Sequence, residues 1–120
     1  CFCKMKYSIG IDIVDVKDFG KRIERTRNLS NRIFTKYEID FCKKRGIEHL
    51  ASRFAAKEAF AKACNLQNIS WYDIEVRNLP SGKPFLNIKS KIKNKLRIKS
   101  TDVSISNIRQ LAVAVVVINR

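Results

Sequence analysis

Alternating apolar and polar positions along the chain predict several β-strands. Residues 7–16 carry isoleucine at positions 9, 11 and 13, residues 71–79 alternate in the same way, and residues 84–88 can return as a hairpin partner after a turn. Residues 102–106 form another candidate strand. Residues 111–118 are apolar at every position, which predicts a central strand covered on both faces.

Helical signals occupy the segments between these strands. Residues 17–26 form a basic amphipathic pattern, and residues 35–38 match a capping box that starts a helix ending near Gly46. Residues 48–64 combine many alanines with helical apolar spacing, and residues 90–96 indicate a short basic helix. Helices packed on a mainly antiparallel sheet make an α+β fold, which is the fold class we expect.

The composition is that of an ordinary soluble globular protein, with 45% hydrophobic and 30% charged residues. The length of 120 residues predicts a single domain over 1–120, in which we expect residues 1–6 to be a disordered or trimmed terminus. No apolar run approaches the roughly 20 residues that span a bilayer, so we expect no membrane partner. We expect a cytoplasmic location; a plastid-type organelle is the alternative, since the chain does not begin with Met.

The cysteines do not suggest a disulfide framework. Cys42 and Cys64 lie in helical patterns, and the spacing of the four cysteines is not that of a small secreted scaffold. The close-spaced pair Cys1 and Cys3 sits at the terminus without the second pair that a four-cysteine zinc site needs. We therefore expect reduced, structural thiols.

A net charge of +14, from 25 basic against 11 acidic residues, indicates an anionic partner. Nucleic acid, membrane headgroups, phosphorylated small molecules and acidic proteins all meet that description. A lysine-rich composition can also reflect a general amino-acid bias of the source organism. Charge alone does not choose among these classes.

Two acidic residues stand out because apolar residues flank them. Asp12 lies in the first predicted strand and Glu58 in the longest predicted helix, where an unpaired, partly buried carboxylate shifts its pKa or binds a cation. Lys62 shares a helix face with Glu58, and Arg53 and Lys57 lie on the neighbouring stripe. These side chains could hold Mg²⁺ and a polyphosphate together. Equally, Glu58 and Lys62 could form a surface ion pair, and Asp12 could cap a helix or bridge to an arginine.

Three motifs in this order resemble one enzyme family. G-I-D-I-V at residues 10–14, R-F-A-A-K-E-A-F-A-K at residues 53–62, and D-I-E-V at residues 73–76 with S-G-K-P at residues 81–84 look like a holo-[acyl-carrier-protein] synthase of the 4′-phosphopantetheinyl transferase superfamily. The similarity runs over about residues 7–118, and the two leading motifs at this separation are specific to the superfamily.

The resemblance implies a reaction and the residues that carry it. The family moves the 4′-phosphopantetheine group of coenzyme A to a serine of apo acyl carrier protein and releases 3′,5′-ADP, with Mg²⁺ as cofactor. Asp12 and Glu58 match the metal ligands, Lys62 matches the residue that holds the diphosphate, and Arg53 and Lys57 match further phosphate contacts. Glu58 and Lys62 are thus the catalytic candidates. Glu58 or a metal-bound water is our hypothesis for the acceptor of the serine proton.

The resemblance also implies a coenzyme A site across a subunit boundary, since small members of the family assemble as homotrimers. Residues 102–107 match the strand that faces the neighbour's coenzyme A, and Ser104 and Ser106 should share one face of it. Asp102 and Asn107 replace residues of many relatives, so we assign them no cross-subunit acid–base role. The cofactor-binding candidates here are Ser106 and, in a turn that resembles a loop near the nucleotide, Gly82, Lys83 and Pro84. Plain sheet polarity and an ordinary hairpin turn explain these residues equally well.

Acyl carrier protein is acidic, so the resemblance makes the first helix a candidate carrier-protein surface, with a solvated helix face as the alternative. Its basic residues are Lys17, Lys21, Arg22 and Arg25. The main rival interpretation of the chain is a basic nucleic-acid-binding module without catalysis, and a third is an inactive structural subunit. Aromatic residues at core-like positions leave no stacking platform for nucleic acid, and intact Asp12, Glu58 and Lys62 count against an inactive subunit. We therefore expect no nucleic-acid partner.

Overall fold

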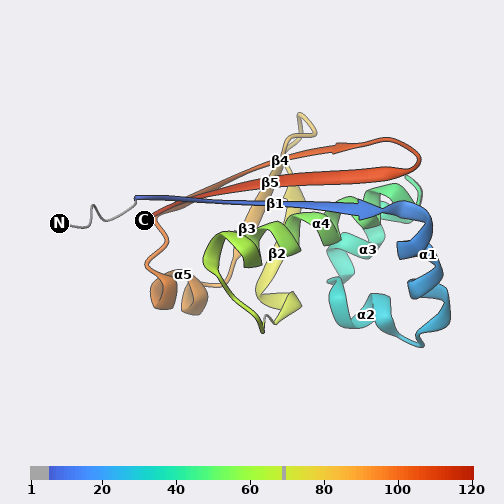
Figure 1. Ribbon diagram of the computed structural model, residues 1–120, viewed down its shortest axis with the longest axis horizontal. Helices are drawn as coiled ribbons and strands as arrows, with labels where there is room; N and C mark the ends of the chain where they lie inside the picture. Colours follow the sequence, from blue (N-terminus) through green and yellow to red (C-terminus); the bar gives the residue numbers. More distant parts are fainter. Residues whose placement is uncertain (1–5, 69) are drawn as a thin grey trace.

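The computed structural model describes residues 6–68 and 70–120 and contains an antiparallel sheet of three long strands (Figure 1). The strands lie in the order β1-β5-β4 and span Tyr7–Asp15, Leu111–Asn119 and Ser100–Asn107 respectively. A hairpin of β2 (Ile74–Asn78) and β3 (Pro84–Ile88) forms a second, two-stranded sheet. Strand β5 is central, as its apolar run predicted.

Helices cover one side of the three-stranded sheet (Figure 1). The longest, α4 (Ile47–Cys64), packs against β1 and β5. Helix α1 (Val16–Arg25) follows β1 directly because the side chain of Asp15 caps it, accepting a hydrogen bond of 2.9 Å from the backbone N–H of Asp18. The other helical elements are α2 (Leu29–Ile33), α3 (Lys36–Cys42), the short 3-10 helix η1 (Trp71–Asp73) and α5 (Ser90–Leu96).

Helix α4 meets the sheet through small side chains. Ala55 and Ala59 of the helix and Ala112 and Ala114 of β5 are all fully buried in one core cluster, so the helix and the sheet approach each other closely. Phe60 adds bulk to the same buried core. One layer of helices on an antiparallel sheet confirms the predicted α+β fold.

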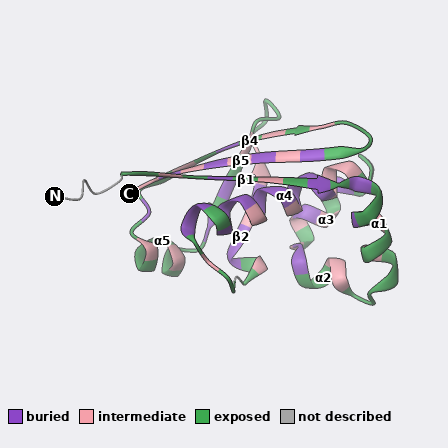
Figure 2. Ribbon diagram, in the orientation of Figure 1, coloured by how far each residue is buried: buried purple, intermediate pink, exposed green. Residues whose placement is uncertain are grey.

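The opposite face of the sheet is open, which corrects one prediction. Residues of β5 alternate between buried positions that face α4 and half-buried positions on the outer face (Figure 2). On the adjacent strand, Ile9, Ile11 and Ile13 are 70%, 58% and 62% exposed. The expectation that β5 is covered on both faces was therefore wrong for a single chain, because the helices pack against one side only.

The capping box at the start of α3 is confirmed. The side-chain oxygen of Thr35 accepts from the Glu38 backbone N–H at 3.3 Å, and the Glu38 carboxylate accepts from the Thr35 backbone N–H at 2.9 Å. The helix ends at Cys42 rather than near Gly46. A turn follows, in which the backbone N–H groups of Arg45 and Gly46 both donate to the carbonyl oxygen of Cys42.

Two other elements differ from the sequence predictions. Residues 71–73 form η1 instead of strand, so β2 begins only at Ile74. The carboxylate of Asp73 is buried there, with the ammonium groups of Lys89 and Lys91 at 3.3 and 3.7 Å. Helix α2 was not predicted because its five residues are too few to reveal a helical apolar period.

Cys42 and Cys64 are buried free thiols, as predicted. Burial raises the pKa of each to about 11, so both stay protonated and unreactive near neutral pH. Cys1 and Cys3, and with them residues 1–5 of the predicted terminus, lie outside the described residues. Within residues 6–68 and 70–120, every helix is too short or too polar to cross a bilayer.

Candidate active site

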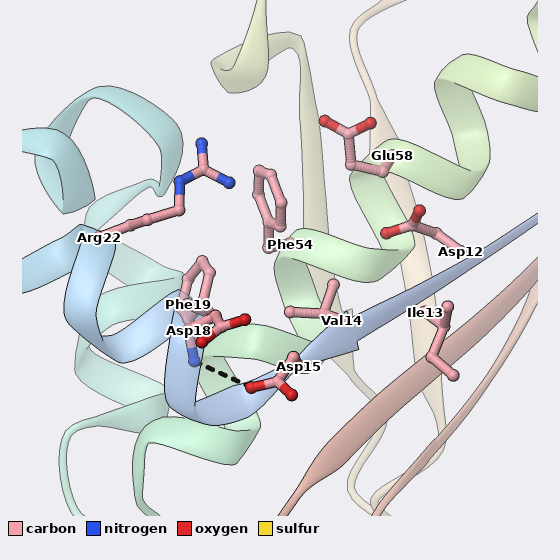
Figure 3. A pocket seen from close by; sticks show the side chains of 9 residues that line it. All are labelled: Asp12, Ile13, Val14, Asp15, Asp18, Phe19, Arg22, Phe54 and Glu58. Atoms are coloured by element: carbon pink, nitrogen blue, oxygen red, sulfur yellow. Dashed lines mark hydrogen bonds between the residues drawn. The ribbon is translucent and has the colours of Figure 1, made fainter.

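A cleft of about 410 Å³ opens between β1, α1 and α4 (Figure 3). Asp12 reaches it from β1 and Glu58 from α4, while Arg22 of α1 and Phe54 of α4 also line it. The remaining lining residues are Ile13, Val14, Asp15, Asp18 and Phe19. The fold thus brings together the two carboxylates that the sequence analysis paired.

The pleat of β1 places Asp12 on the side that faces α4. Gly10 and Val14 are buried on this side with the half-buried Asp12 between them, and Ile11 and Ile13 are exposed on the other face. The Lys62 ammonium group donates to the Asp12 carboxylate at 3.0 Å, with 56% of the lysine side chain and 14% of the aspartate side chain exposed. Asp12 therefore bridges to a lysine rather than to an arginine, and the pair remains open to solvent on the lysine side.

Glu58 is half-buried beside this ion pair. Burial raises the pKa of its carboxyl group, the negative charge of Asp12 raises it further, and the positive charges of Lys62 and Arg22 lower it in part. A carboxylate with a raised pKa is a better proton acceptor near neutral pH than an exposed glutamate. A cation bound between Asp12 and Glu58 would offset the repulsion between their charges.

The donor set suits Mg²⁺. This ion typically takes one or two protein carboxylates and fills its other positions with phosphate oxygens and waters. Among residues 6–68 and 70–120, no cluster of three or more His, Cys, Asp or Glu side chains could hold a metal. A cation held by Asp12 and Glu58 would therefore need oxygens from a bound substrate, as in a site for a diphosphate.

Aromatic side chains form one wall of the cleft. The ring of Phe54 lies 5.4 Å from that of Phe19 and 5.5 Å from that of Trp71, measured between centroids. The sequence analysis treated these residues as core and did not assign Phe19 or Phe54 to the site. Helical spacing alone does not distinguish a cleft wall from a core position, so no local signal marked them.

Lys57 points into the core, which contradicts its predicted role as a phosphate contact. Its ammonium group pairs with the Glu38 carboxylate at 2.6 Å, and neither side chain has exposed surface. It also donates to the carbonyl oxygens of Ile33 at 2.7 Å and Trp71 at 3.0 Å. All three N–H donors of the ammonium group are thereby used. Lys57 joins α4 to α2, α3 and η1 and has no donor left for a ligand.

Arg53 lies in a different cavity of about 210 Å³. Its guanidinium group donates to the Asn78 side-chain oxygen at 2.6 Å and sits 4.4 Å from the centroid of the Phe41 ring. Burial lowers the pKa of Arg53, and its Nε is buried without a hydrogen-bond partner among the described residues. The fold therefore separates Arg53 from Asp12 and Glu58.

The cavity around Arg53 contains part of the predicted nucleotide loop. Gly82 and Pro84 line it together with Arg45 and His49, which the sequence analysis did not assign. His49 and Arg53 are four positions apart on α4, and that spacing was the available signal. Gly82 has a φ of 94°, a left-handed conformation that favours glycine, so the turn itself requires this residue.

Lys83 extends from the same loop toward β4. Its ammonium group lies 3.6 Å from the Asp102 carboxylate, and both residues line a third cavity of about 340 Å³ with Pro84 and Ser104. Ser104 and Ser106 are both exposed, whereas the residues between and beside them face inward, which confirms the predicted shared face. Ser106 itself lies outside that cavity.

One chain does not bring all the predicted site residues together. Asp12 is on β1 and Ser106 is on β4, at opposite edges of the sheet with β5 between them. Neighbouring strands lie about 4.8 Å apart, so the two edge strands are about 10 Å apart. The metal-ligand candidates and Lys62 form one group. A second group near the β4 edge contains Arg53, Gly82, Lys83, Pro84 and Ser106.

The basic residues of α1 lie on the surface of the protein, where a partner could contact them. All of them are exposed, namely Lys17, Lys21, Arg22 and Arg25. Arg22 also lines the cleft that contains Glu58. The basic face of α1 is therefore continuous with the cleft.

Known proteins resemble this chain over nearly its whole length. The family model of the 4′-phosphopantetheinyl transferase superfamily matches residues 8–116. The holo-[acyl-carrier-protein] synthase of Geobacter sulfurreducens is 42% identical over 125 aligned residues, which cover 97% of this chain and 99% of that protein.

Solved structures of holo-[acyl-carrier-protein] synthases have a fold similar to that of this chain. The crystal structure of Helicobacter pylori holo-[acyl-carrier-protein] synthase in complex with coenzyme A has a TM-score of 0.87 at 31% identity, and the match covers 92% of this chain and 99% of that one. A Bacillus anthracis holo-(acyl-carrier-protein) synthase in complex with CoA (3′,5′-ADP) has a TM-score of 0.78 at 35% identity, with 93% and 95% covered.

Proposed function

Because the chain belongs to the holo-[acyl-carrier-protein] synthases of the 4′-phosphopantetheinyl transferase superfamily, we propose that it transfers the 4′-phosphopantetheine group of coenzyme A to a serine of apo acyl carrier protein. The second product is 3′,5′-ADP. The observation that carries this proposal is the convergence of Asp12 and Glu58 on one cleft, with Lys62 bonded to Asp12. A basic helix at the entrance and an open lysine beside two carboxylates suit a reaction between two anionic substrates.

Asp12 and Glu58 are the residues that would hold Mg²⁺. Once bound, the ion supplies positive charge that polarises the phosphoryl oxygens and stabilises the charge that develops on the leaving group. The two-carboxylate donor set and the raised pKa of Glu58 support this assignment.

In this proposal Glu58 accepts the proton of the serine, and Lys62 stabilises the charge of the leaving group. The serine oxygen attacks the phosphorus that bears pantetheine, a new P–O bond forms, and the P–O bond to 3′,5′-ADP breaks. The serine proton passes to the Glu58 carboxylate, which lines the cleft where the serine must arrive. The ammonium group of Lys62, more than half exposed, offsets the negative charge that develops on the phosphate oxygen of the departing 3′,5′-ADP.

Acyl carrier protein docks on α1 in this proposal. The exposed cations of the helix complement an acidic partner, and Arg22 connects them to the cleft where the serine must arrive. Charge complementarity of this kind mainly accelerates association and weakens at high salt.

We propose that the active protein is a homotrimer. The outer face of the sheet exposes Ile9, Ile11 and Ile13, and contact with neighbouring copies would remove this apolar surface from water. A ring of copies also places the β4 edge of one subunit against the β1 edge of the next. The nucleotide-loop group could then complete the cleft of a neighbour, with Arg53, Gly82, Lys83, Pro84 and Ser106 binding coenzyme A. Sedimentation equilibrium should give a mass about three times that of the 13.9 kDa chain.

Mass spectrometry tests the reaction. Apo acyl carrier protein incubated with coenzyme A, Mg²⁺ and this protein should gain the mass of phosphopantetheine, and chelation of the metal should stop the gain. An unmodified carrier protein under the same conditions would contradict the proposal. If the protein instead binds duplex DNA or RNA tightly, with strong salt dependence and no transfer, the basic nucleic-acid-binding interpretation replaces it.

A further inference from the structure

Gly10 is in backbone-to-backbone contact with helix α4. A Cβ atom added at this position would lie 1.9 Å from the carbonyl oxygen of Ala59 and 2.7 Å from the backbone nitrogen of Ala63. Both neighbours are main-chain atoms, so no change of side-chain rotamer could make room. Any larger residue at position 10 must therefore move the strand away from the helix.

This contact lies next to the metal-ligand candidates. Gly10 and Asp12 are two positions apart on the same face of β1, and Ala59 and Ala63 directly follow Glu58 and Lys62 on α4. The aspartate side chain has one methylene group, yet its carboxylate reaches the Lys62 ammonium group at 3.0 Å. Such a short side chain spans little of the gap itself, so the close approach of strand and helix at Gly10 governs how near this carboxylate lies to α4.

We propose that Gly10 is a positioning residue, which sets the gap between β1 and α4 so that the Asp12 carboxylate meets Glu58 and Lys62. This inference rests on the proposed metal site in part, because it assigns the fit of Mg²⁺ between the carboxylates to that gap. The contact of Asp12 with Lys62 depends on the same gap and needs no metal.

The test combines two substitutions that change the gap and the length of the side chain that spans it. Gly10→Ala widens the gap, so Mn²⁺ binding should weaken by about 10- to 100-fold, the range typical when a group that orients a metal ligand is lost. Asp12→Glu adds one methylene group, which should weaken binding in the parent because the carboxylate no longer fits. In the Gly10→Ala background, Asp12→Glu should instead strengthen binding. Electron paramagnetic resonance of Mn²⁺ in the presence of coenzyme A, which supplies the phosphate oxygens, measures all four proteins.

Gly20→Ala is the matched control. A Cβ at position 20 in α1 has its nearest neighbour, the Ile47 side chain, at 3.7 Å, an ordinary contact. This variant should bind Mn²⁺ like the parent and should be slightly more stable, since alanine suits a helix better than glycine. Urea unfolding of each variant separates loss of stability from loss of metal binding. A merely structural role for Gly10 predicts that Asp12→Glu gives no rescue.

Crystal structures without metal provide the independent readout. In Gly10→Ala, the Asp12 carboxylate should lie beyond the roughly 4 Å limit of an ion pair with Lys62. If this variant does not fold, Ala63→Val widens the gap from the helix side and replaces it in both tests. A preserved 3.0 Å contact, or the absence of rescue in a folded variant, overturns the role of Gly10. A parent that binds no Mn²⁺ counts against the proposed metal site, while the crystallographic distance still decides the role of Gly10.

Discussion

Helix α4 carries two lysines that each bind a carboxylate, and the surroundings of the two pairs differ completely. Lys57 meets Glu38 at 2.6 Å with both side chains fully buried. Lys62 meets Asp12 at 3.0 Å with 56% of the lysine side chain exposed. Both lysines belong to one short motif, yet one faces α3 and the core and the other pairs with Asp12, which lines the cleft. The Lys57–Glu38 pair has no surface on which a ligand could bind, whereas the Lys62–Asp12 pair is accessible to a ligand.

The difference follows from the solvent around each pair. A buried ion pair has lost the hydration of both charges, so removing one partner leaves an uncompensated charge in the core. A half-exposed pair keeps water on one side and contributes little to stability, so its charges can be redirected to an incoming phosphate at small cost. One side of α4 therefore contributes to the stability of the fold, and the other side contributes side chains to the candidate active site.

The largest expected effect is on the cleft side. Glu58→Gln removes the proposed metal ligand and the proposed proton acceptor together, so transfer of phosphopantetheine should fall by about 10³-fold or more. The free energy of unfolding should stay close to that of the parent, since Glu58 is only half-buried and has no salt bridge among the described residues. Glu48→Gln makes the same change at the other end of α4 and serves as the control. Near-normal turnover of Glu58→Gln would remove both roles.

The buried side should respond in the opposite way. Lys57→Met leaves the Glu38 carboxylate without its counter-charge in the core, so the protein should lose about 3–5 kcal/mol of unfolding free energy. Lys62→Met should cost at most about 1 kcal/mol, because its pair is half-exposed. Urea denaturation of the two variants measures the contrast. Equal losses of unfolding free energy would show that burial does not distinguish the two pairs. Under conditions in which Lys57→Met is folded, this variant should also retain turnover.

Exposed cations offer a third contrast, between α1 and α5 at opposite ends of the molecule (Figure 1). Reversal of Lys17, Lys21 and Arg25 to Glu should raise the KM for acyl carrier protein by about 10-fold at low salt and leave the KM for coenzyme A unchanged. Arg22 is kept, since it lines the cleft. The matched control reverses three lysines of α5, namely Lys91, Lys93 and Lys95. Steady-state kinetics that change equally in both triple variants would place the docking surface elsewhere.

The smallest effect concerns the pKa of Glu58. Burial is the main cause of its raised pKa and the charge of Asp12 the second, so Asp12→Asn should lower this pKa toward the ordinary value. Because the folded state binds this proton more tightly than the unfolded state, Glu58 makes stability fall as the pH rises from its ordinary pKa through its raised pKa. Asp12→Asn should reduce that fall. Carbon-13 NMR titration of the Glu58 carboxyl group measures the shift, and an unchanged pKa would mean that the two carboxylates do not interact.

Local signals in the sequence were sufficient for most of the fold. The capping box of Thr35 and Glu38 and the central position of β5 in the sheet were predicted correctly, because both depend on neighbours in sequence. The partners of Lys57 and Arg53 were not predictable in this way. Glu38 and Asn78 lie on other elements, and helical spacing cannot tell which side of α4 those elements cover.

The candidate site shows the same limit. Asp12, Glu58 and Lys62 were identified by their motifs, and the structure brings them together. His49 was missed although it lies four positions from Arg53 on α4, and Arg45 was missed because it lies in the turn before that helix, where helical spacing does not apply. Residues 111–118 were expected to be covered on both faces, and only the position of the helices shows that one face of the sheet is open.

Anomalous diffraction from crystals grown with coenzyme A and Mn²⁺ tests the central claim most directly. The account predicts a manganese peak bound by the carboxylates of Asp12 and Glu58, with a diphosphate oxygen of coenzyme A on the ion and Lys62 beside it. A peak at other residues, or carboxylates that turn away from each other around bound coenzyme A, would contradict it.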